Sequence, residues 1–147
     1  MSQFIDWTYE TGRKGQGIGT PLDEKELLLA AEIGIEHPEK VRSIYVDEVP
    51  YPHKNVALKF IGEAVGLVGE GIINNAQVCG YSIYSRKDFV LNRPKLAHEL
   101  VHVLQIERSG LDNVVTQHFS DMAKYGYDKA PSEVEASEAN KKYSANW

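Results

Sequence analysis

The sequence predicts a single α+β domain. Mixed helix and strand patterns run as far as Leu91, and only helical patterns follow from Arg93 onward. The chain has 147 residues, a length at which two separate halves would each bury little core. Its 42% hydrophobic and 25% charged residues argue against disordered, collagen-like and coiled-coil classes. We therefore expect one domain, residues 1–147, with a small twisted sheet followed by C-terminal helices.

The residue patterns in the N-terminal third predict an extended arm, a helix and a strand. Residues 1–19 carry charges, four glycines and scattered apolar residues, so we expect an extended arm. Thr20 and Pro21 introduce a helical pattern that ends at Gly34, with Thr20 as the N-cap and Pro21 as the first helical residue. Residues 41–49 combine β-branched and aromatic residues with partial alternation, which predicts a half-buried strand.

The rest of the chain predicts one more helix, two short strands and then three helices. Residues 55–67 repeat apolar side chains at helical spacing. Residues 78–84 and 88–91, joined by 85–87, are predicted as a hairpin or as two short sheet strands. The three final helices are expected at 93–109, stopped by Gly110, at 111–125, closed by Gly126, and from 131 to about 143.

Charge and cysteine content narrow the class of partner and the compartment. The formal net charge of -5 has the wrong sign for a phosphate-binding surface, so we expect no nucleic-acid partner. Cys79 is the single cysteine and cannot form an internal disulfide, which favours a reducing compartment. The longest apolar run, 27–31, is too short for a membrane span, and no signal-peptide pattern opens the chain. We expect a cytoplasmic protein without membrane association; export without a signal peptide would give the same pattern.

The motif that carries chemistry is HExxH at residues 98–102, inside the predicted helix 93–109. Because an α-helix turns about 100° per residue, His98 and His102 lie one turn apart on one face and reach a single tetrahedral zinc ion. Glu99 lies at the edge of that face, where it reaches a metal-bound water as a general base. A chain of this composition contains the pattern by chance about 0.016 times.

The alternative interpretation is an ordinary amphipathic helix whose histidines only pack beside an apolar stripe. Apolar residues surround the motif on both sides, so the helix is expected to be largely buried. Two buried histidines and a carboxylate without a metal would carry a large desolvation cost. We therefore favour the metal site. The stripe consists of Leu96, Leu100, Val103 and Leu104.

A catalytic zinc site needs a third protein ligand, which must come from elsewhere in the chain. The metzincin pattern requires Gly and His at the positions where this chain has Gln105 and Arg108, so that class is excluded. The downstream candidates are Asp112, His118, Asp121, Asp128, Glu133, Glu135 and Glu138.

Local helix chemistry separates Glu133 from Glu135. If Ser132 is an N-cap, Glu135 returns to the Ser132 backbone amide in a capping box, and Glu133 is left as the free carboxylate. A helix that begins with Pro131 at its first position weakens this reasoning without reversing it. Asp121 opens a segment one residue longer than the DxxYG ligand pattern of the aspzincins. We take Glu133 as the third ligand, with Glu135 and Asp121 as alternatives.

The motif at 98–102, followed thirty-one residues on by Glu133, Ala136 and Ser137, resembles the gluzincins, the thermolysin-like zinc peptidase clan. The resemblance is strongest to their minimal single-domain members and covers about residues 78–140. In that clan the third ligand is the first Glu of a helical ExxAD or ExxSD signature, whose acid supports a ligand histidine. Glu133 and Ala136 match this signature, whereas Ser137 replaces the acid.

The resemblance implies a zincin-like fold and a zinc metallopeptidase, expected to be an endopeptidase acting on a peptide or protein substrate. In the expected mechanism Zn²⁺ is held by His98, His102 and Glu133, and Glu99 takes the proton of the metal-activated water and passes it to the leaving amine. The alternative function is a non-catalytic zinc-containing regulatory or protein-binding domain of the same fold. Because Glu99 is not needed to hold the metal, its presence favours catalysis.

The resemblance also implies places for the substrate and for an oxyanion donor. A strand at the sheet edge, here 78–84, would pair with the substrate backbone. His118, Tyr125 and Tyr127 are candidates to stabilise the developing oxyanion. Cys79 on this strand is interpreted as a small buried hydrophobe in preference to a thiolate that switches off the metal.

Overall fold

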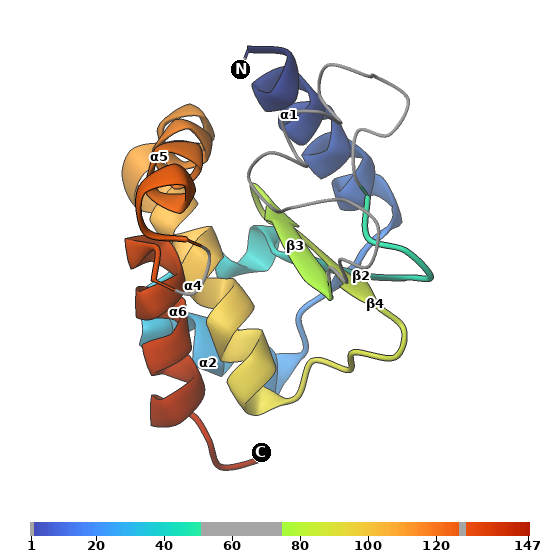
Figure 1. Ribbon diagram of the computed structural model, residues 1–147. Helices are drawn as coiled ribbons and strands as arrows, with labels where there is room; N and C mark the ends of the chain where they lie inside the picture. Colours follow the sequence, from blue (N-terminus) through green and yellow to red (C-terminus); the bar gives the residue numbers. More distant parts are fainter. Residues whose placement is uncertain (1, 51–74, 127–128) are drawn as a thin grey trace.

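The computed structural model of the protein describes residues 2–50, 75–126 and 129–147, and it confirms the α+β class (Figure 1). Within these ranges it contains five α-helices, one short 3₁₀ helix and a four-stranded mixed sheet. Their bounds are α1 (Ser2–Ile18), β1 (Thr20–Pro21), α2 (Glu24–Ile33), η1 (Pro38–Lys40), β2 (Arg42–Val46), β3 (Ala76–Cys79), β4 (Ser82–Arg86), α4 (Arg93–Ser109), α5 (Leu111–Tyr125) and α6 (Pro131–Lys142).

The sheet has the strand order β1-β2-β4-β3, with β2 and β4 parallel and the other neighbours antiparallel. Side chains of β4 alternate between the two faces, as the period of a strand requires. Ser82 faces α1, where its hydroxyl donates to the Gly12 carbonyl, whereas Ile83 belongs to the core built around α4. The sheet therefore lies between α1 on one side and α4 on the other (Figure 1).

The expected extended arm at 1–19 is wrong, because Ser2–Ile18 forms the helix α1. A Cβ added at Gly12 would lie 2.7 Å from the Cys79 carbonyl oxygen, and one at Gly15 would lie 2.6 Å from the Ser82 hydroxyl. Gly12 and Gly15, which lower helix propensity, are thus the positions where the helix approaches the sheet too closely for any side chain. Tertiary packing overrides the local preference.

The helix predicted after Thr20 begins later than expected. Thr20 belongs to β1 and pairs with β2, and Asp23 caps α2 instead. Asp23 accepts from the backbone N–H of Glu26, whose carboxylate accepts from the Asp23 N–H, so these two residues form a capping box and the N-cap lies three residues after Thr20. The predicted end is confirmed: Gly34 closes the helix with φ +111° in the left-handed region.

The strand β2 lies inside the predicted range 41–49, but the predicted pair 78–84 and 88–91 is wrong. The hairpin consists of β3 and β4, and its two-residue turn lies at Gly80 and Tyr81. Gly80 adopts φ +67°, which a tight hairpin turn requires and which glycine adopts without strain. The predicted helix at 55–67 lies outside the described residues.

The three C-terminal helices are confirmed as α4, α5 and α6, and the described core is centred on α4. Apolar side chains of α4 pack with those of α2, with Ile83 and with small residues of α6. In α6, Ala136 and Ala139 are the buried small residues, and they allow its backbone to approach α4 closely. The α4–α6 contact decides which side chains of the two helices meet.

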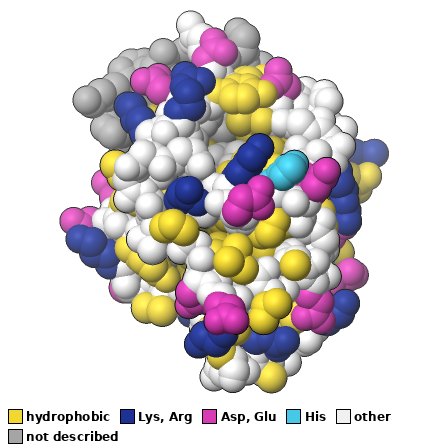
Figure 2. Space-filling model, turned by 180° about the vertical axis from the view of Figure 1, so that it is seen from behind, with side chains coloured by type: hydrophobic (Ala, Val, Ile, Leu, Met, Phe, Trp, Pro, Cys, Tyr) yellow, Lys and Arg dark blue, Asp and Glu magenta, His cyan; other side chains and the backbone are white. Residues whose placement is uncertain are grey.

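The helices of the described ranges, and the charges on one face of the molecule, bear on what the protein could bind. Among the helices in those ranges, none combines the length and apolar character needed to cross a membrane. On the face opposite to that of Figure 1, acidic and basic side chains are interspersed, and neither gathers into a continuous patch (Figure 2).

Candidate metal centre

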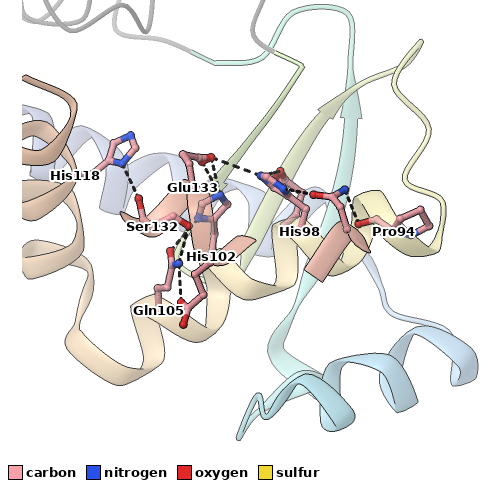
Figure 3. Close-up of polar contacts among 10 residues, drawn as sticks. Pro94, His98, His102, Gln105, His118, Ser132 and Glu133 are labelled. Carbon is pink, nitrogen blue, oxygen red and sulfur yellow. Dashed lines mark hydrogen bonds and ion pairs between the residues drawn. The ribbon is translucent and has the colours of Figure 1, made fainter. Parts of the chain in front are cut away.

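Two helices bring His98, His102 and Glu133 together (Figure 3). The Nε2 atom of His102 lies 3.1 Å from the Glu133 carboxylate, and that of His98 lies 3.5 Å from it. The two imidazole rings are 5.1 Å apart, centroid to centroid. The residue predicted as the third ligand therefore lies beside both histidines of the motif, although thirty-one residues separate it from His102.

Local helix geometry accounts for this convergence. In α4, burial of one face in the core leaves His98, His102 and Gln105 on the neighbouring face at helical spacing. In α6, Glu133 lies in the first turn and shares a face with Ala136, which packs into the core. Close packing of the two helices therefore places the Glu133 carboxylate above the His98–His102 face of α4.

The three side chains fit a tetrahedral zinc ion. Metal–ligand bonds of about 2.0–2.2 Å place neighbouring ligand atoms of a tetrahedron about 3.3 Å apart. The two nitrogen–oxygen separations, 3.1 Å and 3.5 Å, lie on either side of that value. Two histidines and one glutamate are also a donor set of catalytic zinc sites, which keep the fourth position for water.

In this site the buried carboxylate of Glu133 lies beside two imidazoles, those of His98 and His102, that can become positively charged. The Glu133 side chain is 5% exposed, and those of His98 and His102 are 21% and 19% exposed. Burial alone would raise the pKa of Glu133, but hydrogen bonds and charges from the two imidazoles outweigh it and lower the pKa. Burial alone would lower the pKa of His102, but Glu133 outweighs it and raises the pKa to about 9. The carboxylate is therefore ionised and ready to serve as a ligand.

Glu99 is buried next to His98 and His102, but Glu133 is the nearer of the two acids. Its carboxylate lies 3.9 Å from Nε2 of His98, and one oxygen is within 4.8 Å of both ring nitrogens. His98, Glu99 and His102 thus form one possible metal-holding group, and Glu133 lies closer to both imidazoles than Glu99 does. Burial raises the pKa of Glu99, and the charges of the two histidines offset only part of this rise. A carboxylate with a raised pKa is suited to accepting and returning a proton.

The alternative ligands are engaged elsewhere. Glu135 accepts hydrogen bonds from Gln105 and Arg108, and Asp121 accepts one from Gln117. The capping-box argument that favoured Glu133 is wrong, because α6 has Ala130 as its N-cap with no side-chain cap bond. Glu133 is distinguished instead by its place on the face of α6 that packs against α4. Asp128 lies outside the described residues.

Sequence reasoning missed the two amides that contact the histidines. Nδ1 of His98 lies 2.6 Å from Oδ1 of Asn140, and Nδ1 of His102 lies 2.9 Å from Oε1 of Gln105. Gln105 was detectable, since it lies three residues after His102 on the same helix. Asn140 was not, because it lies forty-two residues from His98 and reaches it only through the packing of α6 on α4.

Of the three oxyanion candidates, His118 lies next to the site. Its Nδ1 is 3.2 Å from the hydroxyl of Ser132, the residue before Glu133, and burial lowers the pKa of its imidazole. The imidazole is therefore neutral at pH 7 and carries one N–H. Tyr125 is 44% exposed, and Tyr127 lies outside the described residues.

The predicted substrate strand and its cysteine occupy different positions in the sheet. The range 78–84 spans the end of β3, the turn and part of β4; β3 is the outer strand in the described sheet, whereas β4 is internal. Cys79 is buried on β3, and burial raises the pKa of its thiol to about 12. The thiol is therefore protonated at pH 7, as expected of a small buried side chain.

Comparison with known proteins gave no match: neither a family model, nor a curated protein, nor a solved structure is similar to this chain. Its function is therefore inferred from the site itself.

Proposed function

We propose that this chain is a zinc-dependent peptidase with a zincin-like fold and a metal centre of the gluzincin type. One observation carries the proposal: the Nε2 atoms of His98 and His102 and the buried carboxylate of Glu133 converge at the separations of zinc ligands. A second acid, Glu99, lies beside them and is not required to hold the ion. A site that only bound zinc would have no use for it.

Each side chain has a role in hydrolysis of a peptide bond. When bound, Zn²⁺ supplies positive charge that acidifies a water molecule and polarises a peptide carbonyl. Glu99 accepts the proton of the attacking water, and after the water oxygen adds to the carbonyl carbon it passes that proton to the nitrogen as the C–N bond breaks. His118, neutral and adjacent to the ligand-bearing turn, donates a hydrogen bond to the carbonyl oxygen as its negative charge develops.

The substrate class follows from the same arrangement. β3 has a free edge in the described part of the sheet and contacts α4, the helix of the two histidines. An extended peptide that pairs with this edge brings its backbone carbonyls to the metal centre through main-chain hydrogen bonds. The proposed substrate is therefore an extended segment of a peptide or protein.

The test combines metal content with cleavage. We expect one zinc per chain by elemental analysis of the purified protein, together with cleavage of a peptide library followed by mass spectrometry. Glu99→Gln should keep the zinc and lose cleavage, whereas Glu138→Gln, the same change at an exposed position of α6, should keep both.

Two other results would contradict the proposal. Full zinc with no cleavage by the unaltered protein would favour the alternative of a non-catalytic zinc domain. A protein that binds no zinc at all would overturn both functions.

A further inference from the structure

We infer that Asn140 and Gln105 are positioning residues, which hold His98 and His102 with Nδ1 protonated and Nε2 turned to the metal. The inference deepens the proposed function and rests on it for the identity of the metal. Its physical basis is the orientation of two side-chain amides, each of which has one accepting oxygen and one donating NH₂ group.

The amide of Asn140 has only one orientation that satisfies its neighbours. Its Nδ2 donates to the carbonyl oxygen of Pro94 at 3.1 Å, and a carbonyl oxygen can only accept. The other end, Oδ1, therefore faces Nδ1 of His98 at 2.6 Å. Since Oδ1 is only an acceptor, Nδ1 must carry the hydrogen. In the neutral imidazole the lone pair is then on Nε2, the atom that faces Glu133.

Gln105 repeats this arrangement at the second histidine (Figure 3). Its Nε2 donates to the carbonyl oxygen of Ser132 at 3.0 Å and to the carboxylate of Glu135 at 2.9 Å. Both partners are acceptors, so Oε1 faces Nδ1 of His102 at 2.9 Å and requires a hydrogen on it. Nε2 of His102 is again the atom left for the metal, 3.1 Å from Glu133.

The two amides also tie the helices that supply the ligands. Asn140 extends from α6 to Pro94 at the start of α4, and Gln105 extends from α4 to Ser132 in the first turn of α6. Ser132 directly precedes Glu133, so Gln105 orients His102 directly and holds the backbone of the third ligand. Loss of Gln105 therefore disturbs two of the three ligands, whereas loss of Asn140 disturbs one.

Both amides are neutral, in contrast to the acid that the gluzincin signature places at the position of Ser137. A neutral acceptor fixes the tautomer and the ring plane without adding a further negative charge to the three ligands. Partners of this kind are worth about 10- to 100-fold in metal affinity when they orient a ligand.

The test uses near-isosteric variants that remove only the polar ends, Asn140→Leu and Gln105→Met. Asn113→Leu is the matched control, because it makes the same change at an exposed position of α5. Zinc affinity is measured by competition with a chromogenic chelator, and the imidazole Nδ1–H groups are observed by ¹H–¹⁵N NMR in the zinc-loaded and the metal-free protein.

We expect each variant to weaken zinc binding by about 10- to 100-fold, Gln105→Met the more strongly, while the control stays within twofold of the unaltered protein. A slowly exchanging Nδ1–H signal of His98 should disappear only in Asn140→Leu, and that of His102 only in Gln105→Met. A role confined to general stability would not produce losses selective for one histidine.

The inference would be overturned if both variants bound zinc within twofold of the unaltered protein and kept both Nδ1–H signals. It would also be overturned by an unaltered protein that lacks a protected Nδ1–H on either histidine, a measurement that needs no variant to fold. A protein without zinc affinity would overturn the proposed function, and the signals of its metal-free form would still decide whether the amides orient the rings.

Discussion

The carboxylate of Glu107 joins three separate segments, and its removal gives a prediction whose size follows from the structure. It accepts hydrogen bonds from the Tyr81 hydroxyl at 2.6 Å and from the backbone N–H groups of Glu36 and His37 at 2.8 Å and 3.0 Å. These bonds tie the end of α4 to the turn of the β3–β4 hairpin and to the segment after α2. The turn positions β3, the proposed substrate strand, relative to the helix that carries His98.

Glu107→Gln keeps the shape of the side chain but directs an NH₂ group at donors, so we expect one or two of the three bonds to be lost. Hydrogen bonds to a charged group are worth about 1.5–3 kcal/mol each, and partial exposure of Glu107 reduces this by solvent screening. We expect the free energy of unfolding at pH 7 to fall by about 1–2 kcal/mol. Urea denaturation followed by circular dichroism measures it, with the exposed Glu36→Gln as the charge-matched control.

The pH dependence of this difference has a definite sign. Burial alone would raise the pKa of Glu107, but hydrogen bonds from Tyr81 and from the two backbone amides lower it below its ordinary 4.5. A carboxyl group with a lowered pKa in the folded state stabilises the fold above its unfolded pKa and loses this effect as the pH falls through the folded pKa. The gap between unaltered protein and variant should therefore be full at pH 7 and should shrink below pH 4.5. If the two proteins differed in unfolding free energy by the same amount at pH 7 and below pH 4.5, or did not differ at pH 7, the reasoning would be refuted.

Three further predictions concern the metal centre and α1. Glu133→Gln should weaken zinc binding by at least about 100-fold in a chelator competition, and affinity within tenfold would exclude it as a ligand. His118→Phe should lower kcat on a cleaved peptide by about 100-fold with little change in KM, and an altered KM alone would point to substrate binding instead. Gly12→Ala should lower the free energy of unfolding by about 1–3 kcal/mol, because its Cβ would lie 2.7 Å from the Cys79 carbonyl oxygen. At Gly17 an added Cβ would have no atom within 4 Å, so Gly17→Ala should stabilise the protein by about 0.5–1 kcal/mol in the same urea titration. Equal effects of Gly12→Ala and Gly17→Ala would contradict the packing of α1 against the sheet.

The helix α4 was predictable because every local pattern along it agrees. Asn92 caps it by accepting from the Lys95 N–H, Pro94 lies in its first turn, and Gly110 follows its last residue with a positive φ. These features act over three or four residues, the distance over which helix geometry is determined. The spacing of His98 and His102 on one face follows from them directly.

The helix α1 shows the opposite case. Its glycines oppose a helix locally, yet Gly12 and Gly15 are the points at which α1 meets the sheet. The hydroxyl of Ser82, seventy residues away in sequence, bonds to the carbonyl of Gly12. Because the compensating contacts come from so far along the chain, a pattern confined to the first nineteen residues predicts an arm.

The position of Glu133, the proposed third ligand, is an intermediate case. Two arguments from the sequence favour Glu133, the resemblance to the gluzincin signature and a capping box, and the structure contradicts the second, since no side chain caps α6. Glu133 lies beside both histidines because Ala136 and Ala139 let α6 pack closely on α4. Asn140 depends on the same contact, which explains why it had no signal in the sequence.

The sequence by itself therefore determined that two imidazoles share one helix face with a glutamate beside them, because α-helix geometry is local. Only the tertiary structure decided which distant carboxylate meets them and which amides contact their rings. Those contacts depend on the packing of α6 against α4, and packing is decided by burial of apolar surface across the whole core. A one-residue rotation of either helix would leave every local pattern intact and would separate Glu133 from both histidines.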